Sequence, residues 1–231
     1  MMSVKKHITT KNIVIAVTFC LILVSGILTK QNPLFMIPLF VSLGVMALQA
    51  DVNRTAYLIG GINAGIYGIV YIYMGLYASA ASALLFSCPL QLVTFINWKR
   101  KAYGKATVFK KLTAKARIGL ALVTVLGFGV QQIVLNQLGS DYAILDNIAS
   151  LVGIASSILS LLAYIEYIYL QILGTVLTIA LNVQVTMTNP AHITYLIYSL
   201  YCIYCLAVAF RNVRKLYKEQ QEAAKNRIRD A

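Results

Sequence analysis

Apolar residues gather into long runs along this chain, and short polar breaks separate one run from the next. The runs cover residues 13–29, 34–50, 56–75, 76–97, 118–138, 144–163, 167–185 and 193–210. A helix of about 20 apolar residues, rising about 1.5 Å per residue, crosses a hydrocarbon layer of about 30 Å. Lipid offers no partner to a free backbone N–H or C=O, so each run must be helical. The pattern predicts an all-α integral membrane protein with about eight transmembrane helices.

Composition excludes a soluble protein. The 231 residues are 59% hydrophobic and 12% charged, whereas soluble domains average about 25% charged residues. A secretory signal peptide is the alternative interpretation of the first run. That run is long for the apolar part of a signal, and no clear small-residue cleavage site follows it. We therefore expect it to be retained as a transmembrane helix.

The net charge of +13 indicates orientation rather than nucleic-acid binding. Basic residues gather in three places: before the first run (Lys5, Lys6 and Lys11), within 99–117, and within 211–229. Even numbers of predicted spans separate these segments, so all three lie on one side of the membrane. The positive-inside rule makes that side the cytoplasm. We expect both termini to be cytoplasmic in a multi-pass cell-membrane protein, with the basic excess facing anionic lipid in the bilayer and no nucleic-acid partner.

The basic segment divides the chain into two halves of similar design. The fourth run ends in Phe95-Ile-Asn-Trp-Lys-Arg100 and the eighth in Phe210-Arg-Asn-Val-Arg-Lys215, which share the pattern F-x-N-x followed by two basic residues. Each half holds three successive runs before this exit. The sequence predicts two parallel three-helix repeats in a 3+1+3 core, a transporter plan with substrate near the midplane. The predicted segments are 1–33 with an extra helix, 34–98, the loop 99–117, the linker helix 118–140, 141–210 and the tail 211–231.

Polar side chains inside the predicted spans are candidates for ligand contact. Asn63 and Tyr67 are four residues apart, as are Gln171 and Thr175, so each pair shares one helix face. Intramembrane polar groups face a bundle interior or a watery cavity, although amide side chains also join helices. Both interpretations stay open for each residue. Glu166, between the sixth and seventh runs, is either a site residue or an interfacial cap of the seventh helix.

Signatures of catalysis and metal binding are missing from the sequence. Cys202-x-x-Cys205 has redox spacing, but it lies within an apolar run without a second pair, so we interpret it as helix packing. No nucleophile elbow or phosphate-binding glycine loop is present. A membrane enzyme or scaffold would need Asp141, Asp146 and Glu166 together, yet the topology places Glu166 on the opposite side. We expect no catalytic residues, cofactor or metal, and facilitated diffusion is the simplest mechanism.

Three stretches of the chain resemble the Pnu-type vitamin transporters, whose best-known group imports nicotinamide riboside. The first is 60–67, with Asn-x-x-x-Tyr and a following Gly-Leu-Tyr; the second is Gln-x-x-Thr-Phe-x-x-Trp over 91–98. In the third, an Asp and a Glu twenty residues apart flank a serine-rich helix over 146–166. The chain departs from the family where Glu-x-Trp-x-x-Trp-x-x-x-Asn is usual: those places hold Ile168, Gln171 and Thr175.

The resemblance implies equilibrative uptake of a small vitamin, nicotinamide riboside above all, with trapping through phosphorylation by a cytosolic kinase. Thiamine, riboflavin and nucleosides are the family's other cargoes, and the family resemblance implies a homotrimer. The candidate substrate-binding residues are Asn63, Tyr67, Gln91, Trp98, Glu166, Gln171 and Thr175. The alternative function is the substrate-binding membrane subunit of an energy-coupling vitamin importer, although such subunits typically have six spans and no triplet repeat.

Overall fold

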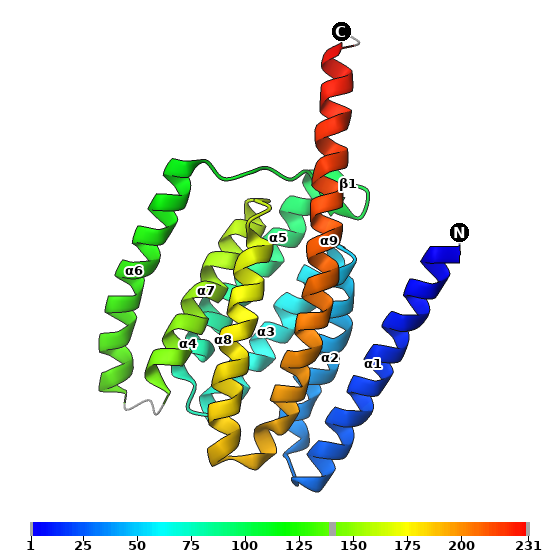
Figure 1. Ribbon diagram of the computed structural model, residues 1–231. Coiled ribbons are helices and arrows are strands. Elements are labelled where there is room, and N and C mark those ends of the chain that lie inside the picture. Colours follow the sequence, from blue (N-terminus) through cyan, green and yellow to red (C-terminus); the bar gives the residue numbers. More distant parts are fainter. Residues whose placement is uncertain (1, 139–141, 230–231) are drawn as a thin grey trace.

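The computed structural model describes residues 2–138 and 142–229, with side chains over 10–138 and 142–226. Nearly all of this chain is helical (Figure 1). The helices are α1 (Met2–Leu28), α2 (Pro33–Ala50), α3 (Thr55–Tyr73), α4 (Tyr77–Ala81), α5 (Cys88–Arg100), α6 (Ala114–Gln137), α7 (Ala143–Leu161), α8 (Tyr167–Thr188) and α9 (Ile193–Arg229). A π-helical segment (Ser82–Ser87) joins α4 to α5, and a 3-10 turn (Pro190–His192) precedes α9. Strands β1 (Ala102–Tyr103) and β2 (Ala106–Thr107) form a short hairpin.

Eight helical segments of the described chain are long and apolar enough to cross a membrane. The fourth combines α4, the π-helical segment and α5 into Tyr77–Arg100. This confirms the predicted all-α membrane fold with eight spans. The second span remains helical through Pro38.

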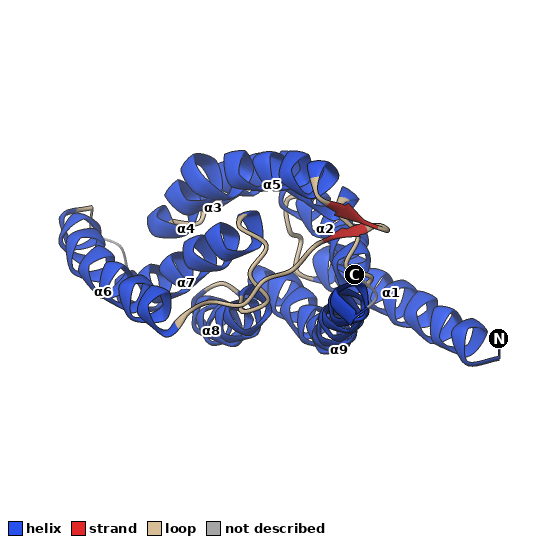
Figure 2. Ribbon diagram, turned by 90° about the horizontal axis from the view of Figure 1, so that it is seen from above, coloured by secondary structure: helices blue, strands red, loops and turns tan. Residues whose placement is uncertain are grey.

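Six of the spans close a ring, and two lie outside it. Packing contacts run from α2 to α3, from α3 to α5, from α5 to α7, then through α8 and α9 back to α2. The first helix packs against α9 and α2, whereas α6 packs mainly against α7 (Figure 2). Leu135 is the one buried residue among those of α6. The outer face of α6 therefore suits contact with lipid.

The first helices of the two predicted three-helix repeats (the triplets), α2 and α7, end in the same kind of turn. Val52 and Ala163, the second residues after α2 and α7, both have positive φ values, 52° and 58°. In each turn two backbone N–H groups bond back to the last helical turn, Asn53 to Leu48 and Tyr164 to Leu159 among them. Such left-handed turns satisfy carbonyls that would otherwise be free at a helix end. The parallel 3+1+3 repeat and its segment boundaries stay a prediction that this likeness supports.

Glycines let α3 approach the fourth span closely. A Cβ added at Gly68 would lie 2.3 Å from a side-chain atom of Leu84, and one at Gly61 would lie 3.0 Å from Leu92. A Cβ at Gly65 would meet open space. Small residues permit this approach because they remove the side chain from the contact.

Helix α9 continues well past the end of its apolar run, into the basic segment 211–229 (Figure 1). The Gln220 side chain holds this extension to the loop between α5 and α6. Its amide nitrogen donates to the Thr107 carbonyl at 2.9 Å, and its oxygen accepts from the Phe109 N–H at 2.8 Å. Figure 1 shows the loop, the C-terminal end of α9 and the start of α1 at the same end of the bundle. We call this the basic end.

Candidate substrate-binding site

A central cavity of about 290 Å³ lies inside the six-helix ring. All six helical segments of the ring contribute to its wall, which agrees with a site between two triplets. The polar lining residues are Gln49, Tyr67, Tyr71, Ser87, Ser156, Ser157, Gln171, Thr175, Thr178, Asn182, Tyr195, Tyr198 and Ser199. Its volume is close to the lower end of the usual range for small-molecule sites, about 300–1,000 Å³.

Two polar groups on α8 are free to bind a ligand. Among the described residues, neither the Gln171 amide nor the Thr175 hydroxyl has a hydrogen-bond partner, and both line the cavity. Thr178, one turn further along, differs because its hydroxyl donates to the Gly174 carbonyl at 2.9 Å. Gln171 and Thr175 can therefore exchange water for ligand without breaking a protein hydrogen bond.

Tyrosine rings form an aromatic wall on the other side of the cavity. Tyr67 and Tyr71 on α3 stack with centroids 5.5 Å apart and an angle of 24° between the rings. The edge of Tyr195 meets Tyr67 at 6.3 Å, and Tyr198 also lines the cavity. Such faces suit a planar heteroaromatic ring, particularly a cationic one. The tyrosines supply aromatic surface to the cavity, whereas α8 contributes no aromatic ring to its wall.

Asn63 faces its neighbouring helix and does not line the cavity. Its side-chain nitrogen donates to the Pro38 carbonyl at 3.0 Å and to the Ser42 hydroxyl at 2.7 Å. Ser42 in turn donates to the Tyr67 hydroxyl at 3.1 Å. Asn63 thus fixes the position of Tyr67 through Ser42, a role that the shared helix face did not reveal.

Gln91 and Trp98 also lie outside the cavity wall. The Gln91 side-chain oxygen is buried beside Gly60, where an added Cβ would come too close to it, and it has no hydrogen-bond partner within the described chain. Trp98 is buried against Tyr57 and Phe109, and its indole N–H donates to the Ser160 carbonyl at 2.9 Å. Trp98 therefore joins α5 to the end of α7.

Glu166 anchors the loop that precedes α6. Its carboxylate accepts from the Leu112 N–H at 3.2 Å and from Arg117 at 3.0 Å. It lies between α7 and α8 at the basic end, away from the central cavity. Of the seven candidate residues, the structure brings Tyr67, Gln171 and Thr175 together around the cavity.

Residues 32–212 match the family model described as nicotinamide mononucleotide transporter. The chain belongs to the nicotinamide mononucleotide transporter family. This match confirms the Pnu-type resemblance and places the chain in a family of transporters rather than enzymes.

Two relatives agree with membership of the nicotinamide mononucleotide transporter family. The chain is 34% identical over 131 residues to the nicotinamide riboside transporter PnuC of Neisseria mucosa. The matched region covers 54% of this chain and 50% of that protein. It therefore spans about half the length of the curated relative that it matches. The crystal structure of the vitamin B3 transporter PnuC is similar in fold, with a TM-score of 0.76 and 22% sequence identity. That similarity covers 91% of this chain and 93% of the other.

Sequence reasoning did not select several cavity residues of this family member. Tyr195 and Asn182 come from different helices and are linked through His192. Its ring stacks on Tyr195 at 4.6 Å, and its Nε2 lies 2.9 Å from the Asn182 side-chain oxygen. Asn182 also donates to the Ser199 hydroxyl at 2.6 Å. A contact between helices leaves no spacing pattern in a single sequence. The signal that could have indicated this cluster was a histidine, His192, at the start of the last span.

Proposed function

We propose that this protein carries nicotinamide riboside across the cell membrane by facilitated diffusion, through alternating exposure of the central cavity. The observation that carries the proposal is the cavity itself, which combines free amide and hydroxyl groups on α8 with tyrosine faces on α3 and α9. The ribose hydroxyls would bond to Gln171 and Thr175. The pyridinium ring would lie against Tyr67 and Tyr71. The name of the PnuC relative supports this choice of substrate.

Tyr67, Gln171 and Thr175 are proposed to contact the substrate directly. Asn63 is proposed to act indirectly, as a positioning residue that holds Tyr67 through Ser42. Trp98 and Glu166 are proposed to support the wall, since they join helices or loops around it, and Gln91 is proposed to fill the space beside Gly60. Thiamine, riboflavin and nucleosides are the competing cargoes. The proposal further places a cytosolic kinase downstream, where phosphorylation adds charge and prevents return through the cavity.

Uptake of labelled nicotinamide riboside by proteoliposomes holding the purified protein alone tests the proposal. We expect saturable uptake without ATP that stops at equal concentrations inside and outside, and accumulation beyond that point when nicotinamide riboside kinase and ATP are enclosed. A substrate-binding subunit of an energy-coupling importer would bind the vitamin yet give no uptake. That outcome would reject facilitated diffusion.

Substitution of the free polar groups on α8 should weaken substrate binding. Gln171→Leu and Thr175→Val each remove one hydrogen bond of about 1 kcal/mol, so we expect about five-fold higher dissociation constants by isothermal titration calorimetry. Thr178→Val is the matched control, because that hydroxyl is bonded within its own helix. Equal affinities in all three variants would remove the α8 face from the site.

Labelling with a membrane-impermeant maleimide tests the proposed cytoplasmic position of the basic end. We expect Lys30→Cys, in the turn between α1 and α2, to react in intact cells. Lys115→Cys, at the start of α6, should react only after the membrane is permeabilised. Even spacing of the spans and the positive-inside rule support this orientation. The reverse labelling pattern would place both termini outside.

A further inference from the structure

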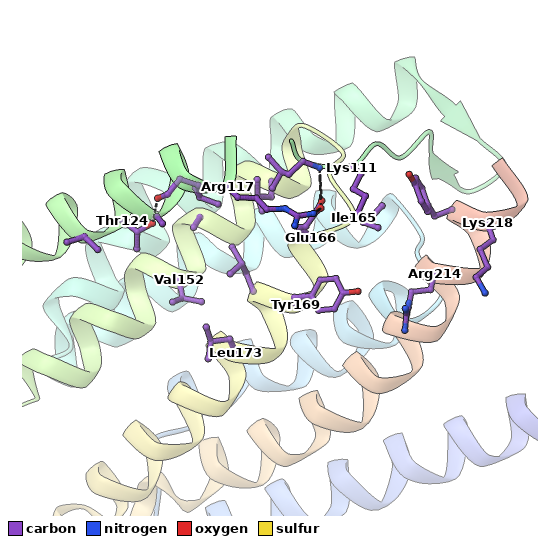
Figure 3. Close-up of a pocket in the computed structure, with 18 residues that line it drawn as sticks. Lys111, Arg117, Thr124, Val152, Ile165, Glu166, Tyr169, Leu173, Arg214 and Lys218 are labelled. Atoms are coloured by element: carbon purple, nitrogen blue, oxygen red, sulfur yellow. Dashed lines mark hydrogen bonds and ion pairs between the residues drawn. The ribbon is translucent and has the colours of Figure 1, made fainter. Parts of the chain in front are cut away.

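A groove of about 920 Å³ runs between α6 and α8, separate from the central cavity (Figure 3). Its walls are almost entirely apolar and come from α6, α7 and α8: Leu120, Ala121, Val125, Val152, Leu159 and Leu173 are among them. The groove faces the surface of the bundle beside α6, the helix least buried within the protein. Its long axis follows the helices away from the basic end.

The mouth of the groove at the basic end is cationic. Lys111, Arg117, Arg214 and Lys218 line it, together with one acidic residue, Glu166 (Figure 3). Glu166 is already paired with Arg117. Within the described chain, Lys111 and Lys218 have no ion pair or hydrogen bond from their ammonium groups, and Arg214 lies 5.0 Å from the centre of the Phe210 ring. Three cationic side chains at the mouth are thus available to an anion.

The backbone around Lys111 is held in place, which fixes the point from which its side chain extends at the mouth. On one side of it, the Lys110 N–H donates to Ala163 and the Lys110 carbonyl accepts from Ile165, both at 3.0 Å. On the other side, the Leu112 N–H donates to the Glu166 carboxylate. The backbone of Lys111 therefore lies between two anchored residues at the end of the groove and needs no ordering when a ligand binds.

We propose that this groove is a binding site for an anionic phospholipid, with the phosphate at Lys111, Arg214 and Lys218 and an acyl chain between α6 and α8. Basic pockets between transmembrane helices on the cytoplasmic side are suited to acidic lipid headgroups. A soluble phosphate would use the mouth alone. The lining on α6, however, extends from Arg117 to Val125, about 12 Å at 1.5 Å per residue, and is mostly apolar. A cationic mouth followed by apolar walls matches a phospholipid, in which a charged phosphate group is followed by acyl chains.

Native mass spectrometry of the purified full-length protein, titrated with phosphatidylglycerol or phosphatidylcholine of equal chain length, tests the proposal. We expect preferential binding of phosphatidylglycerol. Lys111→Gln combined with Lys218→Gln should weaken that binding by about ten- to thirty-fold, given the contribution of each basic residue near a membrane surface. The control pair Lys99→Gln and Lys101→Gln removes equal charge at the basic end without touching the groove, and should leave binding nearly unchanged.

A second variant separates the acyl-chain site from the charge. Ala121→Trp, on an exposed position of α6 that faces the groove, should exclude the chain and reduce binding of phosphatidylglycerol with every cation in place. Leu122→Trp, at an exposed position that does not line this groove, is its control. Equal binding of the two lipids, displacement by inorganic phosphate, or full binding by Ala121→Trp would overturn the proposal. Disulfide formation between two copies at Ala121→Cys, with no bound lipid, would assign the groove to a second copy of the chain.

Discussion

Replacing Gly153 by phenylalanine is expected to reduce nicotinamide riboside uptake by proteoliposomes to the level of protein-free vesicles. Gly153 lies on α7 in the wall of the central cavity, and a Cβ added there meets no atom within 4 Å. A phenyl ring would therefore occupy the cavity, whose volume is about 290 Å³, instead of displacing a neighbouring helix. Substrate and ring cannot share that volume, so the loss should appear in binding as well as in transport.

The matched control is Gly129→Phe. Gly129 lies on an exposed face of α6, and an added Cβ there also meets open space. The control also replaces a glycine by phenylalanine, but its position lies outside the six-helix ring, so transport should be retained. Equal yield and equal thermal unfolding of both variants would show that the fold is intact. Normal uptake by Gly153→Phe would place the transport route elsewhere.

The fold was predictable because a lipid environment leaves the chain few choices. Each span must satisfy its own backbone, so the apolar runs mapped onto helices within a few residues. The two exits that share the motif make comparable contacts from different motif positions. The Trp98 indole donates to Ser160 near the end of α7, and the Asn212 side chain donates to Ala50 at the end of α2 at 2.6 Å. Both exits thus bond the first helix of the other triplet. Helical extension of α9 beyond residue 210 was not predicted, because the basic segment has no apolar run.

The site was predictable only in part, because spacing identifies a helix face without saying what that face meets. The four-residue spacing grouped Gln171 with Thr175, and the structure turns both toward the cavity. The same spacing grouped Asn63 with Tyr67, yet Asn63 turns to α2 and bonds Pro38 and Ser42. The groups across the cavity, such as Tyr195, come from helices distant in sequence. Their proximity depends on packing between spans, which one sequence does not encode as a pattern.

Asp146 is expected to be the acidic residue on which folding depends most. It is fully buried at the start of α7, and its carboxyl group accepts hydrogen bonds from the N–H groups of Ala78 and Ser79, at 2.9 and 3.0 Å, and from the Ser79 hydroxyl. Those donors belong to the first turn of α4, in the other half of the chain. Asp146 therefore joins α7 to α4 at the end of the bundle opposite the basic end while capping the fourth span.

Replacing Asp146 by alanine should destabilise the protein by about 3 kcal/mol or more, because it leaves buried donors without a partner. That corresponds to a melting temperature lower by on the order of 10 °C, measured on the purified protein in detergent. Asp146→Asn keeps one acceptor oxygen and should be intermediate. The control is Asp51→Ala, which removes a half-exposed carboxylate paired with Lys11 at 2.5 Å and should change stability by at most about 1 kcal/mol. If Asp146→Ala had the same melting temperature as the control, the contact between α4 and α7 would depend on apolar packing alone.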